Sequence, residues 1–287
     1  MMKANIPVRW LMKKRLLFLD LDGTLLNDAK EITAGNREAL DRTLQRGHGV
    51  IITTGRPLKS ALAQARRLGL DKPGCYTIAY NGAMVYDWGK QDNVFTRALD
   101  IHSVIRVFDK ANEIGEHIQT YDSFNVLVEA RGDDEALRRY CKMVSMTHRV
   151  IGDVHTDLKE DPVKCLVINY EKKDGLLKMQ EWIRANMEGM DCFFSCEQFL
   201  EVVPKGMNKG EAVKMLCKLL NVEIENAVAC GDAANDLAML KAAGIGVAMI
   251  NGSDEVKAVA DYITTRDNNH DGVAEAADKF FYEDAET

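Results

Sequence analysis

Two aspartates stand two positions apart in the string Asp20-Leu21-Asp22-Gly23-Thr24, directly after an apolar run at residues 16–19. Two carboxylates this close around a bend repel each other unless a cation compensates their charge. Mg²⁺ suits such a place, because it is a hard ion that binds carboxylates, phosphate oxygens and water together. The string therefore predicts a magnesium site that can also take a phosphate group.

Further polar side chains follow other apolar runs in the same way. Thr54, Asn81 and Asp232 each lie at or just past the end of such a run, and Asp236 lies one helical turn beyond Asp232. Open α/β sheets bind their ligands at the carboxyl ends of parallel strands. Any one of these residues alone is more simply a turn former or a helix cap. Their convergence on strand ends is what favours a single site.

Two cations belong to this pattern. Lys209 follows the expected N-cap Asn208, so it lies in the first turn of a helix, where a positive charge opposes the helix dipole. A phosphate beside the aspartates would offset that cost, although a solvated surface lysine is the alternative, and Lys205 is a weaker candidate for the same role. Arg56 follows Thr54-Gly55 and could contact substrate or pair with an acid.

Short apolar runs alternate with helical spacing in the first 83 residues and again after residue 194. Strand, helix, strand order predicts a parallel sheet with right-handed crossovers. The expected strands are residues 16–19, 50–52, 76–80, 227–230, 245–249 and 262–264, and the expected helices are residues 33–46, 57–68 and 208–220.

The middle of the chain has a different pattern, with strands expected at 124–129 and 164–169 and helices at 104–112, 134–146 and 175–187. We therefore expect an α/β fold with a Rossmann-like three-layer core, made of residues 1–83 and 195–287, and an inserted α+β domain at residues 84–194. Residues 1–14 are expected to form an N-terminal extension of the core.

Composition excludes several classes of protein. The net charge of −7 argues against binding of nucleic acid, which requires a basic surface. Seven scattered cysteines without a CxxC pair indicate reduced thiols and no zinc site. No apolar stretch is long enough for a membrane span, so we expect a cytoplasmic monomer or homodimer without a membrane partner. GxSxG, Walker A and GxGxxG strings are also absent from the sequence.

One string imitates a calcium loop. Asp267, Asn269 and Asp271-Gly272 have the spacing of such a loop, with Asp278 at its final ligand position. The final ligand is normally a longer, bidentate Glu, and the preceding segment is a predicted strand where a calcium loop has a helix. We therefore interpret Asp271 as the N-cap of the last helix.

Four strings together resemble the haloacid dehalogenase superfamily of phosphatases, in particular its Cof-type branch with a large α/β cap. Asp20-Leu21-Asp22-Gly23-Thr24 is similar to the first motif of the superfamily, and Thr54 within residues 51–57 is similar to the second. Lys209 within residues 205–210 is similar to the third, and Gly231-Asp232-Ala233-Ala234-Asn235-Asp236 to the fourth. The resemblance covers nearly the whole chain. One departure is Met249-Ile250-Asn251-Gly252, where this branch often has Met-Gly-Asn-Ala.

The resemblance implies a role for each matching residue. Asp20 would attack phosphorus, and Asp22 would act as general acid and then as general base. Mg²⁺ would be held by Asp20, the backbone carbonyl of Asp22 and Asp232, with support from Asp236. The phosphoryl oxygens would be held by Thr54, Lys209, Asn235 and the backbone amides of Leu21 and Gly55, with Arg56 and Asn81 in support.

The implied activity is hydrolysis of small phosphorylated metabolites, most of all sugar phosphates, under a closing cap. A phosphosugar mutase or phosphotransferase with the same phosphorylated aspartate is one alternative, and a sugar-phosphate sensor without catalysis is another. On the cap, Asp122, Asn125, Glu129 and Lys164 are candidate substrate contacts, and each is also explained as a solvated strand residue.

Overall fold

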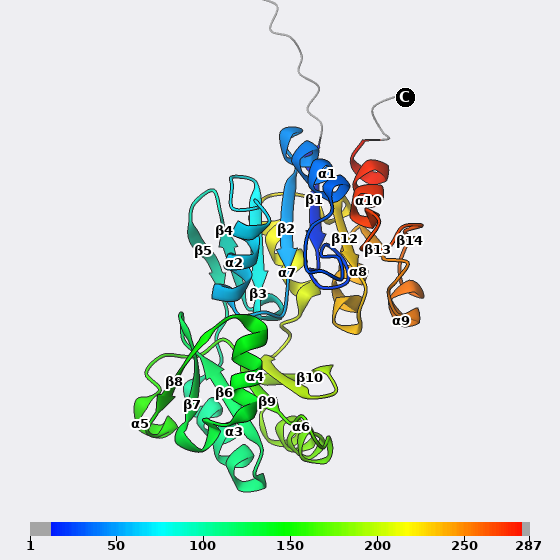
Figure 1. The fold of residues 1–287 in the computed structure, drawn as a ribbon. Coiled ribbons are helices and arrows are strands. Elements are labelled where there is room, and N and C mark those ends of the chain that lie inside the picture. Colours follow the sequence, from blue (N-terminus) through cyan, green and yellow to red (C-terminus); the bar gives the residue numbers. More distant parts are fainter. Residues whose placement is uncertain (1–12, 283–287) are drawn as a thin grey trace, which may run out of the picture.

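The computed structural model describes residues 13–282 and consists of two α/β units, one above the other in Figure 1. The expected N-terminal extension at residues 1–14 lies almost wholly outside the described residues. No helix among residues 13–282 is long and apolar enough to cross a membrane.

The core unit is built on an eight-stranded sheet with the order β14-β13-β12-β1-β2-β3-β4-β5. All neighbours from β14 to β3 pair in parallel, whereas β4 and β5 form an antiparallel hairpin at one edge. The strands are β1 (Leu16–Leu19), β2 (Gly49–Thr53), β3 (Cys75–Ala79), β4 (Met84–Asp87), β5 (Asp92–Thr96), β12 (Ala227–Gly231), β13 (Ile245–Ala248) and β14 (Tyr262–Ile263).

Helices cover both faces of this sheet. They are α1 (Ala34–Gln45), α2 (Leu58–Arg67), α7 (Lys209–Leu219), α8 (Leu237–Ala242), α9 (Asp254–Lys257) and α10 (Gly272–Phe281), with 3-10 turns η1 (Tyr80–Gly82), η3 (Ile224–Asn226) and η4 (Ala234–Asp236).

The strands of the core are buried on both faces. Leu17 and Leu19 of β1 pack in one apolar cluster with residues of α1, α2 and α10. Leu16 and Phe18, which point the opposite way, pack in a second cluster with residues of α7, α8 and α9. Alternate side chains of a strand point to opposite faces, so β1 is apolar throughout and the core has three layers.

The second unit, the cap, is built on a six-stranded sheet with the order β10-β11-β9-β6-β7-β8. Helices α3 and α6 pack on one face of this sheet and α4 on the other. The elements are α3 (Ile101–Ile114), β6 (His117–Tyr121), β7 (Asn125–Glu129), η2 (Ala130–Gly132), α4 (Glu135–Val144), β8 (Thr147–Ile151), α5 (Val154–Asp157), β9 (Cys165–Ile168), α6 (Asp174–Asn186), β10 (Met190–Cys196) and β11 (Phe199–Pro204).

The boundaries between core and cap differ from the expected residues 84 and 194. Strands β4 and β5 extend the core sheet, so the core continues to Thr96. Strands β10 and β11 complete the cap sheet, so the cap continues to Pro204. Both errors concern hairpins at the edge of a sheet, whose local pattern does not reveal which sheet they join.

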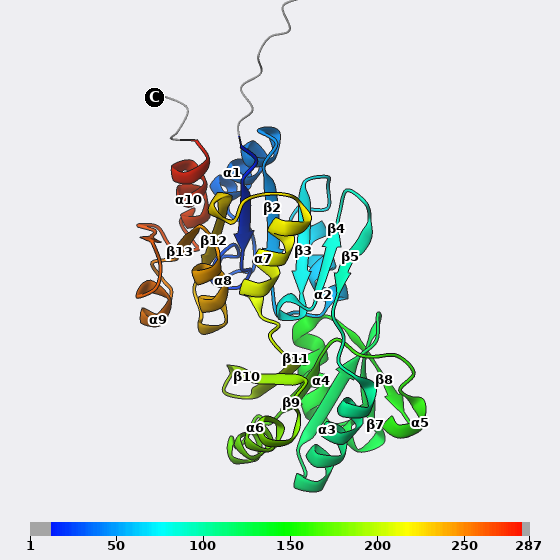
Figure 2. The same ribbon diagram turned by 180° about the vertical axis from the view of Figure 1, so that it is seen from behind.

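The arrows of the parallel core strands point toward the cap, and both views place the cap beyond that edge of the core sheet (Figures 1 and 2). The predicted α/β class, parallel core and inserted domain are confirmed. The carboxyl ends of the strands therefore face the second unit, and the polar residues that follow them lie between the two.

Candidate active site

Strands β1, β2 and β12 are neighbours in the sheet, and each delivers one site residue at its carboxyl end. Asp20 follows β1 and continues its ladder, because its backbone N–H donates to the carbonyl of Cys230 at 3.1 Å. Thr54 follows β2, and its N–H donates to the carbonyl of Ile78 at 2.9 Å. Asp232 follows β12. The sheet thus brings together three residues that the sequence separates widely.

Lys209 joins two carboxylates at the centre of the site. Its Nζ lies 2.5 Å from Oδ1 of Asp20 and 2.6 Å from Oδ1 of Asp236, and its side chain is 1% exposed. The lysine is placed by α7, whose N-cap is Asn208, with its side chain accepting from the amides of Gly210 and Glu211. The predicted cap is confirmed, and the anions that offset the lysine's position include two aspartates.

Asp236 is itself fixed by the backbone. Its Oδ2 accepts from the amides of Asp232 and Ala233, at 3.0 and 3.1 Å. Both oxygens of Asp236 are therefore occupied by protein donors, while the side chain orients the turn that carries Asp232. Asp236 thus supports the site and leaves Asp20 and Asp232 as the more available carboxylates.

Burial controls the charge of these acids. Burial raises the pKa of Asp20 to about 7, with Lys209 opposing and Asp236 adding to the rise. Burial also raises the pKa of Asp232 to about 6, again with a contribution from Asp236. For Lys209, burial would lower the pKa, but the negative charges of Asp20 and Asp236 raise it above its usual range. An additional cation beside Asp20 and Asp232 would therefore stabilise their ionised forms.

Asp22 is held apart from this cluster. Its Oδ2 accepts from Arg56 Nη2 at 2.8 Å, and its Oδ1 accepts from Lys30 Nζ at 2.9 Å. Partial burial would raise the pKa of Asp22, but the Arg56 guanidinium and Lys30 outweigh it and lower the pKa. Of the two roles open to Arg56 in the sequence, the structure shows pairing with an acid. The contact of Lys30 was missed, because no motif marks a lysine eight residues away in a loop.

The residues after Asp22 pack closely on Asp232. Thr24 Oγ1 donates to Asp232 Oδ1 at 2.7 Å. Gly23 has a φ of +85°, and a Cβ there would lie 2.4 Å from Asp232 Oδ2. Only glycine fits this position without strain, because it tolerates positive φ and has no side chain. The glycine in the string Asp20-Leu21-Asp22-Gly23-Thr24 is therefore required by the close packing of this loop against Asp232.

Asp20, Asp232 and Asp236 form a group that could hold a metal ion, with ligand atoms within 4.8 Å of one another. Within residues 13–282, Oδ2 of Asp20 and Oδ2 of Asp232 accept no hydrogen bond. Two free carboxylate oxygens on acids with raised pKa values fit a hard divalent cation. The carboxylate of Asp22 lies outside this group, and the predicted role of its backbone carbonyl stays a prediction.

Backbone donors for a phosphoryl group are also present. Across residues 13–282, the amides of Leu21 and Gly55 donate to no protein acceptor. Thr54 Oγ1 accepts from the amide of Arg56 at 3.2 Å, which leaves the hydroxyl hydrogen of Thr54 free to donate. Asn235 is half-buried in the turn after β12. The phosphate-binding role of these groups stays a prediction, and the donors that it requires are available.

Asn81 lies behind Gly55. It is 2% exposed, and neither polar atom of its side chain has a hydrogen-bond partner. Its φ of 56° is in the left-handed region, and its Oδ1 lies 2.8 Å from the place of a Cβ on Gly55. Asn81 therefore packs against Gly55 at the carboxyl end of β2, and its side-chain amide is still available for a hydrogen bond.

The candidate residues of the cap divide into two kinds. Asp122 accepts from the amides of Phe124 and Asn125, and Glu129 accepts from Asn112 and the amide of Val154, so both stabilise the cap itself. Lys164 is 1% exposed and pairs with Glu201 at 2.6 Å. Its Nζ also donates to the carbonyl of Gly55 in the core, at 3.3 Å.

Comparison with known proteins agrees with this geometry. Residues 17–276 match the family model of haloacid dehalogenase-like hydrolases. The chain is 32% identical to the 5-amino-6-(5-phospho-D-ribitylamino)uracil phosphatase YitU of Bacillus subtilis, over 94% of this chain and 98% of that protein. It is 28% identical to the pyridoxal phosphate phosphatase YbhA of Escherichia coli, over 92% and 97%.

A solved haloacid dehalogenase-like hydrolase from Bacteroides thetaiotaomicron superposes with a TM-score of 0.84 at 33% identity, covering 93% of this chain and 99% of that one. Fold and sequence thus agree with these proteins over nearly the whole length. The chain belongs to the haloacid dehalogenase-like hydrolases, and within them it is a phosphatase of phosphorylated small molecules.

Proposed function

We propose that the protein is a Mg²⁺-dependent phosphohydrolase that acts on sugar phosphates through a phosphorylated Asp20. The observation that carries the proposal is the separation of two acids on one loop. Asp20 is 7% exposed and bound to Lys209, whereas Asp22 is held by Arg56 and Lys30. Two carboxylates in different environments suit two different roles in one reaction.

In the first half of the reaction, a carboxylate oxygen of Asp20 attacks phosphorus and the bond from phosphorus to the leaving oxygen breaks. Asp22 gives a proton to that oxygen, so the alcohol leaves neutral. Lys209 holds Asp20 in place, with its Nζ 2.5 Å from Oδ1. The free amides of Leu21 and Gly55, with Thr54 and Asn235, bind the phosphoryl oxygens.

In the second half, Asp22 takes a proton from water, and the water oxygen attacks phosphorus. The bond between phosphorus and Asp20 breaks, which releases inorganic phosphate and restores the carboxylate. The ion pairs of Asp22 with Arg56 and Lys30 favour its ionised form, which is the form needed for this half. For the first half, Asp22 must be protonated, so bound substrate has to weaken these ion pairs.

Asp20 and Asp232 would hold Mg²⁺, with the carbonyl of Asp22 as the third protein ligand and Asp236 in support. When bound, the ion supplies positive charge that offsets repulsion between the nucleophile and the anionic substrate. The raised pKa values of Asp20 and Asp232, about 7 and about 6, support this assignment.

Sugar phosphates are the proposed substrates for two reasons. YitU, whose name specifies a phosphoribityl compound, shares 32% identity with this chain along almost its whole length. The cap also places a lysine–glutamate pair, Lys164 and Glu201, next to the second strand end of the core. A paired, overall neutral boundary favours a hydroxylated leaving group over a second phosphate.

Phosphate release from a panel of phosphorylated metabolites, with and without Mg²⁺, tests the proposal. We expect turnover of at least one sugar phosphate with Mg²⁺, a loss of at least about 10³-fold without it, and no turnover by Asp20→Asn. A phosphorylated Asp20, trapped by reduction with borohydride and located by mass spectrometry, identifies the nucleophile.

The same assays separate the alternatives. An isomeric sugar phosphate without release of inorganic phosphate would show a mutase. If no ester is cleaved, and Asp20→Asn binds sugar phosphates as well as the wild type does, the protein is a sensor and the proposal is wrong.

A further inference from the structure

The loop that carries Asp22 is held by contacts on its inner and its outer side. Two inward hydrogen bonds close it, from the amide of Leu25 to the carbonyl of Asp20 at 3.2 Å and from the amide of Leu26 to the carbonyl of Leu21 at 2.8 Å. Asp22 itself is 41% exposed at its side chain. Its location depends on its ion pairs with Arg56 and Lys30 and also on what holds the outer side of the loop.

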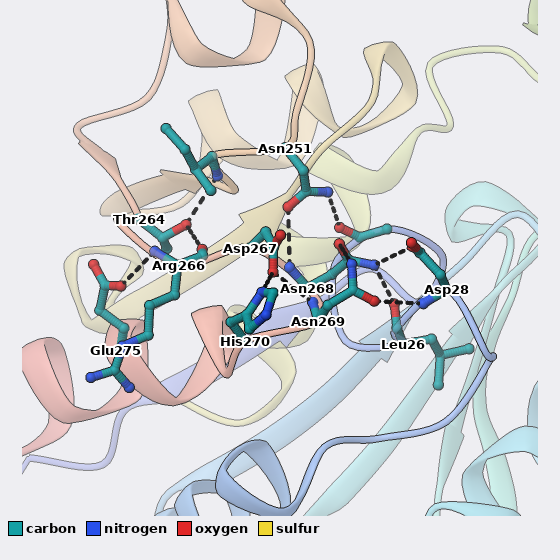
Figure 3. A network of polar contacts seen from close by, with 12 residues as sticks. Leu26, Asp28, Asn251, Thr264, Arg266, Asp267, Asn268, Asn269, His270 and Glu275 are labelled. Carbon is teal, nitrogen blue, oxygen red and sulfur yellow. Dashed lines mark hydrogen bonds and ion pairs between the residues drawn. The ribbon is translucent and has the colours of Figure 1, made fainter.

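Two asparagines hold that outer side. Asn251 Nδ2 donates to the carbonyl of Gly23 at 2.8 Å, directly after Asp22. Asn268 Nδ2 donates to the carbonyl of Leu26 at 3.0 Å and to Asp28 Oδ1 at 3.3 Å. Figure 3 shows Asn268 pointing at Leu26 and Asp28, with Asn251 beside it.

The two asparagines are also joined to each other. The backbone amide of Asn268 donates to Asn251 Oδ1 at 3.2 Å, so both the oxygen and the nitrogen of the Asn251 side chain have a partner. Asn268 is 4% exposed, and its neighbour Asn269 accepts from the amide of Asp28 at 3.0 Å. We call Asn251 and Asn268 the asparagine clamp. A carboxamide both donates and accepts, so neither aspartate nor leucine can replace it in full.

The clamp rests on a rigid base. Thr264 Oγ1 donates to the carbonyl of Arg266 at 2.6 Å and accepts from the amide of Ile250 at 3.0 Å. Glu275 of α10 accepts from the amides of Thr265 and Arg266, at 2.8 and 3.0 Å, and Figure 3 shows its contact with Arg266. The segments of both asparagines are thus fixed to each other and to the last helix.

The string that imitates a calcium loop is part of the same base. Asp267 Oδ1 accepts from the amide of Asn269 and pairs with His270, and Asp271 Oδ1 accepts from the amide of Asn36. These oxygens serve protein donors. Asp271 is the N-cap residue of α10, as the sequence predicted, but its side chain makes no hydrogen bond to the first turn of that helix.

We propose that Asn251 and Asn268 are positioning residues for Asp22: by fixing the carbonyls of Gly23 and Leu26, they set the distance from the Asp22 carboxyl group to the leaving oxygen. The proposal rests on the proposed function, because it concerns proton transfer by Asp22. It assigns a task to the C-terminal segment, which lies far from Asp22 in the sequence.

The consequence depends on the leaving group. A sugar alkoxide is a poor leaving group and requires a proton from Asp22, whereas nitrophenolate leaves readily without one. A displaced Asp22 should therefore slow hydrolysis of an alkyl phosphate much more than hydrolysis of p-nitrophenyl phosphate. Simple damage to the fold would slow both alike.

The test measures kcat/KM of Asn251→Ala and Asn268→Ala on p-nitrophenyl phosphate and on the best alkyl phosphate of the wild type. We expect a loss of about tenfold to 10²-fold on the alkyl ester and less than about threefold on the aryl ester. Asn268→Asp, which keeps the shape but loses the donor, should behave like Asn268→Ala. Asn186→Ala is the matched control, because Asn186 Nδ2 also donates to a backbone carbonyl, that of Trp182, in the cap.

Hydrogen exchange of the Leu25 and Leu26 amides gives a second measurement that needs no turnover. Loss of either clamp residue should speed their exchange, and Asn186→Ala should not. Equal losses on both esters, or unchanged exchange, would overturn the clamp alone. A wild type that cleaves no ester would instead refute the proposed function and, with it, the role given to the clamp. Because Asn251 is exposed, its variant keeps the test usable if Asn268→Ala does not fold.

Discussion

The charge state of each acid at this site depends on the groups that lie within a few ångströms of it. Asp20 and Asp232 each combine burial with neighbouring negative charge, and both have raised pKa values, about 7 and about 6. A carboxyl group with a higher pKa in the folded chain binds protons more tightly there than in the unfolded chain. Its contribution to stability is greatest at low pH and falls as the pH rises from about 4 to about 7.

Binding of Mg²⁺ at the proposed site should therefore depend on pH, because the ion would bind the carboxylates of Asp20 and Asp232 and displace their protons. At a Mg²⁺ concentration about 100 times Kd, we expect stabilisation by about 2.7 kcal/mol at pH 7.5 and less than half of that at pH 5.5. Thermal unfolding with and without Mg²⁺ at the two pH values measures this difference.

The quantity to compare between the two pH values is the stabilisation by Mg²⁺, which is the difference between the unfolding curves with and without the ion. Burial lowers the pKa of His48 to about 4, which gives the protein a pH dependence of opposite sign below neutrality. That effect is common to both curves and cancels. Asp232→Asn should remove most of the Mg²⁺ effect, and an equal effect of Mg²⁺ at both pH values would contradict the assignment.

Two glycines allow a controlled test of packing at the site. Gly23 and Gly47 have nearly the same φ, +85° and +84°, but a Cβ on Gly23 would strike Asp232 whereas one on Gly47 would meet nothing within 4 Å. Gly47→Ala should cost about 1–2 kcal/mol of unfolding free energy, from the left-handed backbone alone. Gly23→Ala should cost more and should also lower kcat/KM by at least about tenfold. Equal stability and normal turnover in both variants would disprove the steric role of Gly23.

At the scale of elements, a buried ion pair of the cap lies against the core, because its lysine also donates to a core carbonyl. Lys164 precedes β9 and Glu201 lies on β11, the last strand before the chain returns to the core helix α7. The lysine is 1% and the glutamate 6% exposed, and Lys164 also reaches the carbonyl of Gly55. The sequence marked Lys164 as a possible substrate contact, and the structure adds its partner.

Removing one member of this pair should be worse than removing both. Lys164→Met should lower the free energy of unfolding by about 3–5 kcal/mol, since it leaves the Glu201 carboxylate buried without its partner. The double variant Lys164→Met/Glu201→Leu should recover most of that loss, because apolar replacement of a buried pair is often neutral or stabilising. Urea unfolding measures both variants.

The surface pair of Lys72 and Asp41, at 2.7 Å, is the control. Lys72→Met should cost no more than about 1 kcal/mol, because solvent screens exposed pairs. A double variant as unstable as Lys164→Met would show that the lysine contributes through its contact with Gly55 and not through its charge partner.

At the scale of the whole molecule, core and cap share an apolar cluster. Tyr80 and Ala83 of the core pack in it with Tyr121 and Tyr140 of the cap, and the Tyr80 and Tyr121 rings lie 5.5 Å apart, edge to face. A continuous apolar contact couples the stability of two units.

We therefore expect core and cap to unfold together. Trp88 lies in the core and Trp182 on α6 of the cap, so Trp182→Phe and Trp88→Phe, each combined with Trp10→Phe, leave one reporter per unit. Calorimetry measures the overall stability of each variant. After the midpoints of urea unfolding are corrected for that difference in stability, the two variants should have the same midpoint. Removing the shared contact with Tyr121→Ala should separate them. Different midpoints for core and cap while Tyr121 is intact would contradict the coupling.

The sequence by itself was sufficient for the features that depend on local pattern. Apolar runs ending in Asp20, Thr54 and Asp232 identified the strands and the edge where their ends meet, because buried parallel strands are apolar throughout. Asn208 was recognised as a helix cap because its signal is local. The motif order then indicated the family.

Only the tertiary structure decided the features that depend on partners distant in the chain. Edge hairpins β4–β5 and β10–β11 joined sheets that their own sequence does not specify, which moved both domain boundaries. The pairing of Lys209 with two aspartates, of Lys164 with Glu201, and of the asparagine clamp with the loop after Asp22 arises when the fold brings these groups together. Pairwise contacts of this kind leave no periodicity in a sequence, and so they become visible only in three dimensions.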